Sequence, residues 1–510
     1  MLSKVNSFAL DGLIGYKVDI EIDINAGLPK VEIIGLPDAA IKESAERVTS
    51  SVKNSGYHFP VKRVIVNLAP ADTKKEGSLF DLPMAVGILI ASGQIISPNY
   101  KDFVILGELS LDGQLRPING LMAIMISALQ QGYKKFLIPE ENAAEASYIK
   151  GVETYCVRSL RQACEFLAGE TEIAPVPHRE FSDAVAKDRY DLDFSDVKGQ
   201  RTAKRAMEIA VAGGHNILLI GPPGAGKSMI AKCVVSIMPD LTFEEAIEVT
   251  KVYSVAGQLD EKKGIVTTRP FRTPHHTATI PALVGGGNKA KPGEVSLANH
   301  GVLFLDEVPE YKRALLETLR QPLEDGEITV TRVQQTVKYP ANFMLIGSMN
   351  PCPCGNYGSK KQICTCTPQA IRRYLNRLSG PLLDRIDIQV EVDSVEFVDL
   401  RSAEPEEPSS RVKERVMQAR EIQRKRFSDR PIYTNSDMNN RLIKQYCRIP
   451  AEAESMMETA FRKLALSARA SFRILKVART IADLEGKENI ETAHVAEAIQ
   501  YRSLDRKYFS

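Results

Sequence analysis

Cysteine, excess charge of one sign and long hydrophobic runs are all scarce in this 510-residue sequence. The chain has 8 cysteines, four of them within fifteen residues, so it is not a disulfide-stapled scaffold. The longest apolar stretch, around Met84 to Ala91, is far shorter than the roughly 20 residues that cross a bilayer. The formal net charge of +2 leaves the partners open, because a near-neutral total can hide local basic patches.

A targeting signal is also missing from the first residues. Residues 1–25 alternate apolar and polar side chains and lack the short apolar core of a signal peptide. We therefore expect a cytoplasmic protein with no membrane partner. Its 44% hydrophobic and 25% charged residues are ordinary for a globular protein, and its length predicts two to four domains.

The pattern of the chain divides it into four stretches. Residues 1–170 are predicted to be α/β, with strands at 18–22, 61–68, 103–106 and 135–138, helices at 82–92 and 120–130, and a turn at Asp112-Gly113. Residues 171–195, acidic and proline-containing, are a predicted linker. Residues 196–398 carry a nucleotide-binding motif, and residues 411–510 have helical periodicity.

A glycine-rich loop follows a short apolar run at residues 216–220. The run predicts a buried strand, and the residues after the loop are predicted to be helical, which is the context that a P-loop requires. Glycines let the backbone turn several amide N–H groups toward phosphate oxygens. The loop predicts ATP as the ligand, with Lys227 reaching the β- and γ-phosphates and Ser228 binding Mg²⁺. It consists of Gly221, Pro222, Pro223, Gly224, Ala225, Gly226, Lys227 and Ser228.

Two further apolar runs end in polar side chains. Residues 301–305 lead to Asp306 and Glu307, and residues 343–349 lead to Asn350. At the carboxyl edge of a parallel sheet, such side chains meet where phosphate ligands bind. We expect Asp306 to hold Mg²⁺ through water and Glu307 to orient or deprotonate the attacking water. Asn350 either positions that water or caps its strand, and both interpretations stay open.

Longer motifs resemble those of a known family. Residues 269–277 read RPFRTPHHT, 350–355 read NPCPCG, 379–387 read SGPLLDRID and 467–480 read SARASFRILKVART. With the P-loop, they resemble the magnesium-chelatase-like AAA+ proteins of the YifB/ComM group, essentially from end to end. The resemblance implies the fold class: a Lon-protease-like (S5-like) α/β domain, a P-loop AAA+ α/β domain with a parallel sheet, and a C-terminal helical lid.

The resemblance also implies a homo-hexameric ring and two arginines that act on the nucleotide. Arg385 would be the arginine finger that enters the ATP site of the neighbouring subunit, where an always-charged guanidinium can fork onto γ-phosphate oxygens. Arg473, on the helical lid, would be the second sensor. The alternatives are a structural pair of Arg385 with Asp384 or Asp387, and a solvated role for Arg473.

The connection from Lys227 to Asp306 spans 79 residues, which is long for neighbouring strands. The resemblance makes residues 269–287 within it an insertion in the second core helix. Residues 326–339 alternate like a β-hairpin, and in related ring motors such hairpins line the central pore. Arg332 and Lys338 are candidates for contacting a nucleic-acid backbone, and a merely solvated role is equally open.

Two close cysteine pairs follow Asn350. Cys352 and Cys354 are separated by nine residues from Cys364 and Cys366. Four thiolates at this spacing can close a tetrahedral, structural Zn²⁺ site that would pin the loop leaving Asn350. Because C-x-C is tighter than the more usual C-x-x-C, four reduced thiols in a polar loop are the alternative.

The N-terminal segment resembles the Lon protease domain without its catalytic pair. Lon-type peptidases need a serine nucleophile that a lysine activates. Here Leu79 falls at the nucleophile's position and Met122 at the lysine's, and the adjacent Ser78 has no lysine at the required place. We therefore expect no peptidase activity, and a role in ring assembly or in contact with a partner or DNA.

The function that the resemblance implies is an ATP-driven DNA motor with helicase or branch-migration activity on single-stranded or branched DNA. Homologous recombination or natural transformation (competence) would be its setting, with recombination proteins as candidate partners. The basic residues between 411 and 430 add modest support. Two other classes stay open: a protein-remodelling ATPase like the magnesium-chelatase small subunit, and a scaffold that uses ATP only to assemble.

Overall fold

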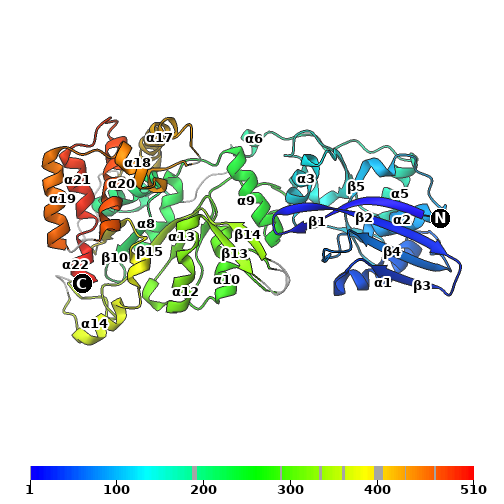
Figure 1. Ribbon diagram of the computed structural model, residues 1–510, viewed down its shortest axis with the longest axis horizontal. Coiled ribbons are helices and arrows are strands. Elements are labelled where there is room, and N and C mark those ends of the chain that lie inside the picture. The colour runs from blue at the N-terminus through cyan, green and yellow to red at the C-terminus, as the bar shows by residue number, and fades with distance from the viewer. Residues whose placement is uncertain are drawn as a thin grey trace. The chain divides into compact units, whose positions relative to one another are not determined.

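A computed structural model of the protein describes residues 2–185, 192–287, 290–331, 336–358, 362–394, 406–430, 432–464 and 467–509. The chain forms two compact units (Figure 1). Unit 1 comprises Met1–Asp188 and Thr242–Thr267, and unit 2 comprises Arg189–Leu241 and Thr268–Ser510. This division differs from the predicted ranges at residues 242–267, which belong by their contacts to unit 1 although they lie inside the predicted 196–398 segment.

A seven-stranded sheet forms the centre of unit 1, in the order β3-β4-β2-β1-β5-β8-β9. The pairs β1–β2 and β2–β4 are antiparallel and the other four are parallel. Val18, Ile20 and Ile22 are fully buried, as the alternation in this strand predicts. The strands are β1 (Leu2–Asp11), β2 (Ile14–Asn25), β3 (Lys30–Ile34), β4 (Arg63–Ala69), β5 (Phe103–Ile105), β8 (Lys135–Pro139) and β9 (Glu153–Val157).

The helices predicted in this unit are confirmed as α2 (Asp81–Ala91) and α3 (Leu121–Gln130). The turn at Asp112-Gly113 joins two short antiparallel strands, β6 (Glu108–Leu109) and β7 (Leu115–Arg116). The remaining elements from the N-terminal stretch are α1 (Ala39–Asn54), η1 (Tyr100–Asp102), η2 (Glu140–Asn142), α4 (Ala143–Ala146), α5 (Leu160–Ala168) and α6 (Phe181–Val185).

The arm, residues 242–267, joins unit 1 from the middle of the chain. Its helix α9 (Phe243–Ala256) begins with a capping box between Thr242 and Glu245 and packs on α3. The Ser254 hydroxyl donates to the buried Glu145 carboxylate over 2.5 Å and accepts from the Gly120 N–H over 2.8 Å. The arm is therefore hydrogen-bonded into the interior of unit 1.

A five-stranded sheet forms the centre of unit 2, in the order β11-β12-β15-β10-β16. All four strand pairs are parallel, which confirms the predicted parallel sheet. The strands β10 and β12 are buried over their whole length, as expected for strands that are covered on both faces. The five are β10 (Ile217–Ile220), β11 (Phe271–Arg272), β12 (Val302–Leu305), β15 (Met344–Met349) and β16 (Ile388–Glu391).

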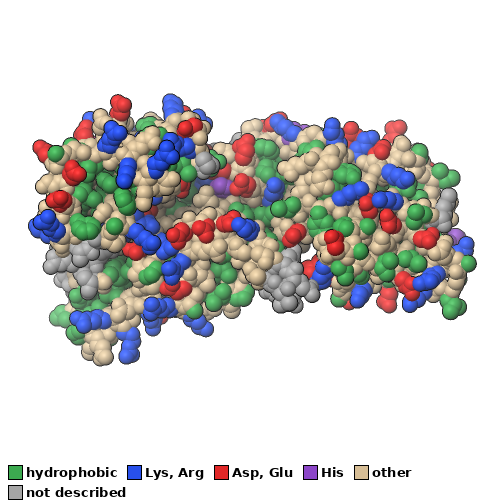
Figure 2. Space-filling view, in the orientation of Figure 1, with side chains coloured by type: hydrophobic (Ala, Val, Ile, Leu, Met, Phe, Trp, Pro, Cys, Tyr) green, Lys and Arg blue, Asp and Glu red, His purple; other side chains and the backbone are tan. Residues whose placement is uncertain are grey.

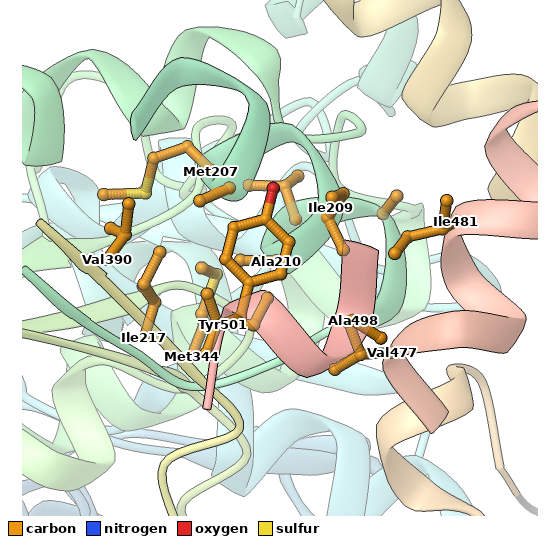
Figure 3. Close-up of a cluster of buried hydrophobic side chains, with 14 of the residues drawn as sticks. Met207, Ile209, Ala210, Ile217, Met344, Val390, Val477, Ile481, Ala498 and Tyr501 are labelled. Carbon is orange, nitrogen blue, oxygen red and sulfur yellow. The ribbon is translucent and has the colours of Figure 1, made fainter. Parts of the chain in front are cut away.

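The same hydrophobic core joins this sheet to the C-terminal helices, so the predicted helical region is confirmed. In Figure 3, Met207, Ile209 and Ala210 of α7 lie between strand residues such as Ile217 and lid residues such as Ile481. The helices are α7 (Arg201–Gly213), α17 (Ser409–Arg426), η7 (Asn435–Asp437), α18 (Asn440–Tyr446), α19 (Ala451–Leu464), α20 (Ala468–Leu484), α21 (Thr492–Gln500) and α22 (Leu504–Tyr508).

The predicted hairpin at 326–339 is confirmed as β13 (Glu327–Thr331) paired antiparallel with β14 (Thr336–Pro340), and Arg332 lies outside the described residues. No described helix is long and apolar enough to cross a membrane. The remaining elements of unit 2 are short: η3 (Phe194–Asp196), α8 (Lys227–Cys233), η4 (Val234–Ile237), α10 (Ile280–Val284), α11 (Glu294–Leu297), η5 (Val308–Glu310), α12 (Arg313–Glu317), η6 (Thr318–Arg320), α13 (Pro322–Asp325), α14 (Pro368–Leu375) and α15 (Gly380–Leu383).

Candidate active site

The glycine-rich loop runs from the end of β10 to the start of α8. Gly224 and Gly226 have φ angles of 75° and 86°, in the left-handed region that favours glycine. No heavy atom outside their immediate neighbours lies within 4 Å of where a Cβ would stand on either residue, so this side of the loop is open. The sequence thus supplies a backbone turn that leaves room for a ligand.

Lys227 connects this loop to the end of β15. Its ammonium group donates to the carbonyl oxygens of Gly221 and Pro222, over 2.7 and 2.8 Å, and to Asn350 Oδ1 over 3.0 Å. Burial lowers the pKa of Lys227, and the nearby carboxylates of Asp306 and Glu307 oppose that shift. The ammonium is therefore held at the carboxyl ends of two adjacent parallel strands, β10 and β15.

A hydroxyl and a carboxylate meet beside the lysine. Ser228 Oγ donates to Asp306 Oδ2 over 2.9 Å, which joins the start of α8 to the end of β12. Ser348 also donates to the Asp306 carboxylate and accepts from the Glu307 N–H over 3.4 Å. Oxygen donors of this kind fit Mg²⁺, and the open loop with its ammonium fits a polyphosphate.

Sequence reasoning missed Ser348. The signal that was present is its position two residues before Asn350, because alternate residues of a strand project to the same face. Ser348 is also a fully buried polar residue within an apolar strand. Its hydroxyl fixes the Asp306 carboxylate, so it orients the group that we expect at the metal.

Glu307 has an exposed side chain on a constrained backbone. Its φ angle is 52°, in the left-handed region that non-glycine residues seldom adopt. Such a backbone costs on the order of 1–3 kcal/mol and is typical of functional sites. This backbone conformation places the Glu307 carboxylate next to Asp306 and leaves the Glu307 carboxylate accessible to water.

The Arg385 side chain is buried within unit 2. Its side chain is only 9% exposed, and it pairs with Glu324 of α13 rather than with Asp384 or Asp387, the partners that the sequence offered. Its guanidinium also donates to the Pro381 carbonyl over 2.7 Å, while Nε has no hydrogen-bond partner among the described residues. The guanidinium is therefore held within unit 2 by the Glu324 carboxylate and the Pro381 carbonyl.

Arg473 lies on α20 and pairs with Asp387, so it is not a merely solvated side chain. Asp387 also accepts a hydrogen bond from His215 Nδ1 over 3.2 Å, and His215 Nε2 lies 2.8 Å from Thr480 Oγ1. Although burial raises the pKa of Asp387, the charge of Arg473 and the His215 hydrogen bond outweigh it and hold the pKa well below its usual value. This network ties the lid helix to the strand β16.

The four clustered cysteines come together as predicted. Their sulfur atoms all lie within 4.8 Å of one another, and Cys352 is fully buried. At the positions of the Lon-type pair, the described residues of unit 1 bring no serine and lysine together. Met122 is buried and apolar, Leu79 packs on the core, and Ser78 donates to the Glu108 carboxylate.

Comparison with protein families matches three stretches of the chain. A family model for magnesium chelatase, subunit ChlI, matches residues 193–400. Models for subunit ChlI of Mg-chelatase and for the ChlI C-terminal region match residues 20–142 and 406–502. These matches fall in both compact units.

Individual relatives are similar over nearly the whole chain. Competence protein ComM of Haemophilus influenzae is 43% identical over 508 residues, which is 99% of this chain and 98% of that protein. The protein YifB of Escherichia coli is 41% identical over 507 residues, with the same coverage. The magnesium-chelatase 38 kDa subunit of Rhodobacter capsulatus is 25% identical over 335 residues, 61% of this chain and 86% of that protein.

Proposed function

Because the chain belongs to the magnesium-chelatase-like AAA+ family that includes ComM and YifB, we propose that it is an ATP-hydrolysing DNA motor that works as a hexameric ring. One observation carries the proposal: Lys227, Ser228, Asp306 and Asn350 meet at the carboxyl ends of three neighbouring parallel strands. This edge is where ligands bind in open α/β sheets. The motor would act in the cytoplasm, where ATP and DNA occur together.

Each side chain of this site has a role that its contacts support. Lys227 neutralises the β- and γ-phosphates after exchanging its carbonyl partners for phosphate oxygens, while Ser228 and Asp306 hold Mg²⁺. Glu307, exposed and next to Asp306, orients or deprotonates water, and Asn350 positions it. The four cysteines hold a structural Zn²⁺ in the same unit.

Arg385 acts on the ATP of the next subunit in this proposal. Its present carboxylate partner, Glu324, has a side chain that is 61% exposed, so the pair can open toward solvent. Release exchanges one carboxylate for the γ-phosphate oxygens of the neighbour, which stabilise the guanidinium in the same way. Arg473 remains at the lid, where it senses the nucleotide through the Asp387 contact.

DNA is proposed as the substrate because a relative of full-length similarity is named a competence protein. The hairpin offers Lys338, whose side chain is 64% exposed and pairs with Glu327 over 2.6 Å. The basic helix α17 gives less support for DNA binding. Its Arg415 and Arg426 pair with carboxylates of unit 2, and its Arg420 donates to the Val211 carbonyl. On the face drawn in Figure 2, basic and acidic side chains are interspersed.

The test compares ATP hydrolysis with and without branched or single-stranded DNA. Strong stimulation that falls with added salt supports the DNA motor, because phosphate contacts release counterions. The Glu307→Gln variant should bind ATP and form rings but lose turnover by about 100-fold or more. Glu310→Gln, at the end of the 3-10 helix that Glu307 precedes, is the matched control and should keep turnover. Retained turnover in Glu307→Gln would remove that residue from its role.

A second candidate function is ATP-driven remodelling of a protein client. The observation that favours it is the similarity to the magnesium-chelatase 38 kDa subunit. In that case DNA would leave the ATPase rate unchanged, and a protein client would co-purify and raise it. These two outcomes separate the candidates in one set of assays.

A further inference from the structure

The cysteine cluster has the dimensions of a metal site. The sulfur of Cys352 lies 3.4 Å from that of Cys354 and 3.6 Å from that of Cys364, and the sulfurs of Cys354 and Cys364 are 3.6 Å apart. A tetrahedron with Zn–S bonds of 2.3 Å has sulfur atoms roughly 3.8 Å apart. A disulfide would need about 2.05 Å. These three distances are close to the tetrahedral value, and the sulfur of Cys366 lies within 4.8 Å of the other three.

Backbone groups already support these sulfurs. The Cys354 N–H donates to Cys366 Sγ over 3.4 Å, and the Tyr357 N–H donates to Cys352 Sγ over 3.3 Å. Such donors compensate negative charge on thiolates and orient them as ligands. Together with three half-buried cysteines and one buried cysteine, they leave a compact S₄ donor set in unit 2.

The segment that carries the cluster contacts the nucleotide site at two points. Cys352 follows Asn350 by two residues, and Asn350 accepts from Lys227. A Cβ added to Gly355 would stand 2.4 Å from Pro223 Cδ and 2.9 Å from Pro223 Cγ, so the backbone of Gly355 lies against the P-loop. The cluster therefore lies on a segment that fixes both the lysine's partner and the loop itself.

We propose that a Zn²⁺ on Cys352, Cys354, Cys364 and Cys366 is a brace for the P-loop, so that the affinity for ATP depends on the bound metal. The metal ties Cys352 and Cys354 to Cys364 and Cys366, which holds Gly355 against Pro223 and Asn350 against Lys227. Without it, no bond joins the two cysteine pairs, and the loop relaxes from the P-loop. The inference rests on the proposed ATP binding.

The first experiment identifies the metal. Elemental analysis of the purified chain should find about one Zn²⁺ per subunit, and X-ray absorption should show four sulfur neighbours at about 2.3 Å. Cys364→Ser should lower the zinc content, whereas Cys156→Ser, in unit 1, should not. A folded wild-type chain without zinc, or with iron in its place, overturns the assignment.

The second experiment tests the brace without removing a cysteine. Gly355 and Gly358 both have a φ of 80°, so alanine strains the backbone at either position. Only at Gly355 would the new methyl meet Pro223, since the nearest atoms to a Cβ on Gly358 are 3.8 Å away on Lys507. Gly355→Ala should keep its zinc and bind a fluorescent ATP analogue about tenfold more weakly, and Gly358→Ala should bind it like the wild type.

Chelation and zinc re-addition complete the test. Removing zinc from the wild-type protein should weaken binding of the analogue about tenfold, and adding zinc back should restore it, with circular dichroism confirming that the chain stays folded. Equal affinity with and without zinc overturns the brace but leaves the proposed ATPase intact. Failure of the zinc-loaded wild type to bind ATP would instead overturn the proposed function.

Discussion

Each unit buries a lysine, and the comparison between Lys75 in unit 1 and Lys227 in unit 2 shows what makes a site. Burial lowers the pKa of both. Lys75 donates to the Thr73 carbonyl of its own loop, over 2.7 Å. Lys227 instead contacts Asn350 from another strand and lies near the carboxylates of Asp306 and Glu307. A buried cation becomes useful when groups from several strands converge on it.

The largest effect should separate these two lysines. Lys227→Met removes the cation that neutralises the phosphates, so ATP hydrolysis should fall to background, while Lys75→Met should keep the wild-type rate. A coupled assay of phosphate release on both variants checks this. Equal loss of activity in the two variants, with both chains folded, would mean that Lys227 has no special role.

A loss of about 100-fold or more is expected for Arg385→Ala, because an arginine finger stabilises charge on the transferring phosphate. Glu324→Gln weakens the contact that holds Arg385 within its own subunit, so its ATPase rate should equal or exceed that of the wild type. Steady-state hydrolysis by assembled rings measures both. If Arg385 and Glu324 form only a structural pair, both variants should instead lose thermal stability alike and the ATPase rates should follow stability.

A smaller effect is expected in unit 1, where Glu145 anchors the arm. Burial raises the pKa of Glu145 to about 6, against the lowering hydrogen bonds from Ser254, the Met122 N–H and Asn142. Because this folded-state pKa lies above the ordinary value of 4.5, the folded state binds more protons between the two values. The contribution of Glu145 to stability is therefore complete below pH 4.5 and is lost as the pH rises through 6.

The predicted change from pH 7.5 to 4.5 is a gain of roughly 2 kcal/mol in the free energy of unfolding of unit 1. Other groups titrate in this range, so the quantity to compare is the wild type against Glu145→Gln, which lacks this part of the pH dependence. Hydrogen exchange of the α9 and α3 amides reports it. Identical pH profiles for the two proteins would show that Glu145 does not titrate in this window.

Local patterns in the sequence predicted most of the site. The strand ends at Lys227, Asp306 and Asn350 could be placed because apolar runs and a glycine-rich loop are short-range signals, and parallel strands bring their carboxyl ends to one edge. The cysteine cluster and the hairpin at 327–340 were predictable for the same reason. Each depends on residues fewer than about twenty apart in the chain.

The features that the sequence did not reveal depend on long-range contacts. The arm's place in unit 1 depends on the Ser254–Glu145 hydrogen bond, which joins residues 109 positions apart. Arg385 pairs with Glu324, 61 positions away, although Asp384 and Asp387 are closer in sequence. Asp387 pairs with Arg473 and His215 instead. Competition among carboxylates in a folded unit decides such pairs, and no local pattern encodes it.

The most direct test of the central claim mixes two inactive variants, Lys227→Ala and Arg385→Ala. Each subunit lacks one half of the proposed site, but an Arg385→Ala subunit next to a Lys227→Ala subunit has its own ATP and its neighbour's arginine. Random mixing into closed rings places about a quarter of the interfaces in this arrangement. The account predicts that ATP hydrolysis, near background in either variant alone, reappears in the mixture. Mixed rings that stay inactive would contradict it.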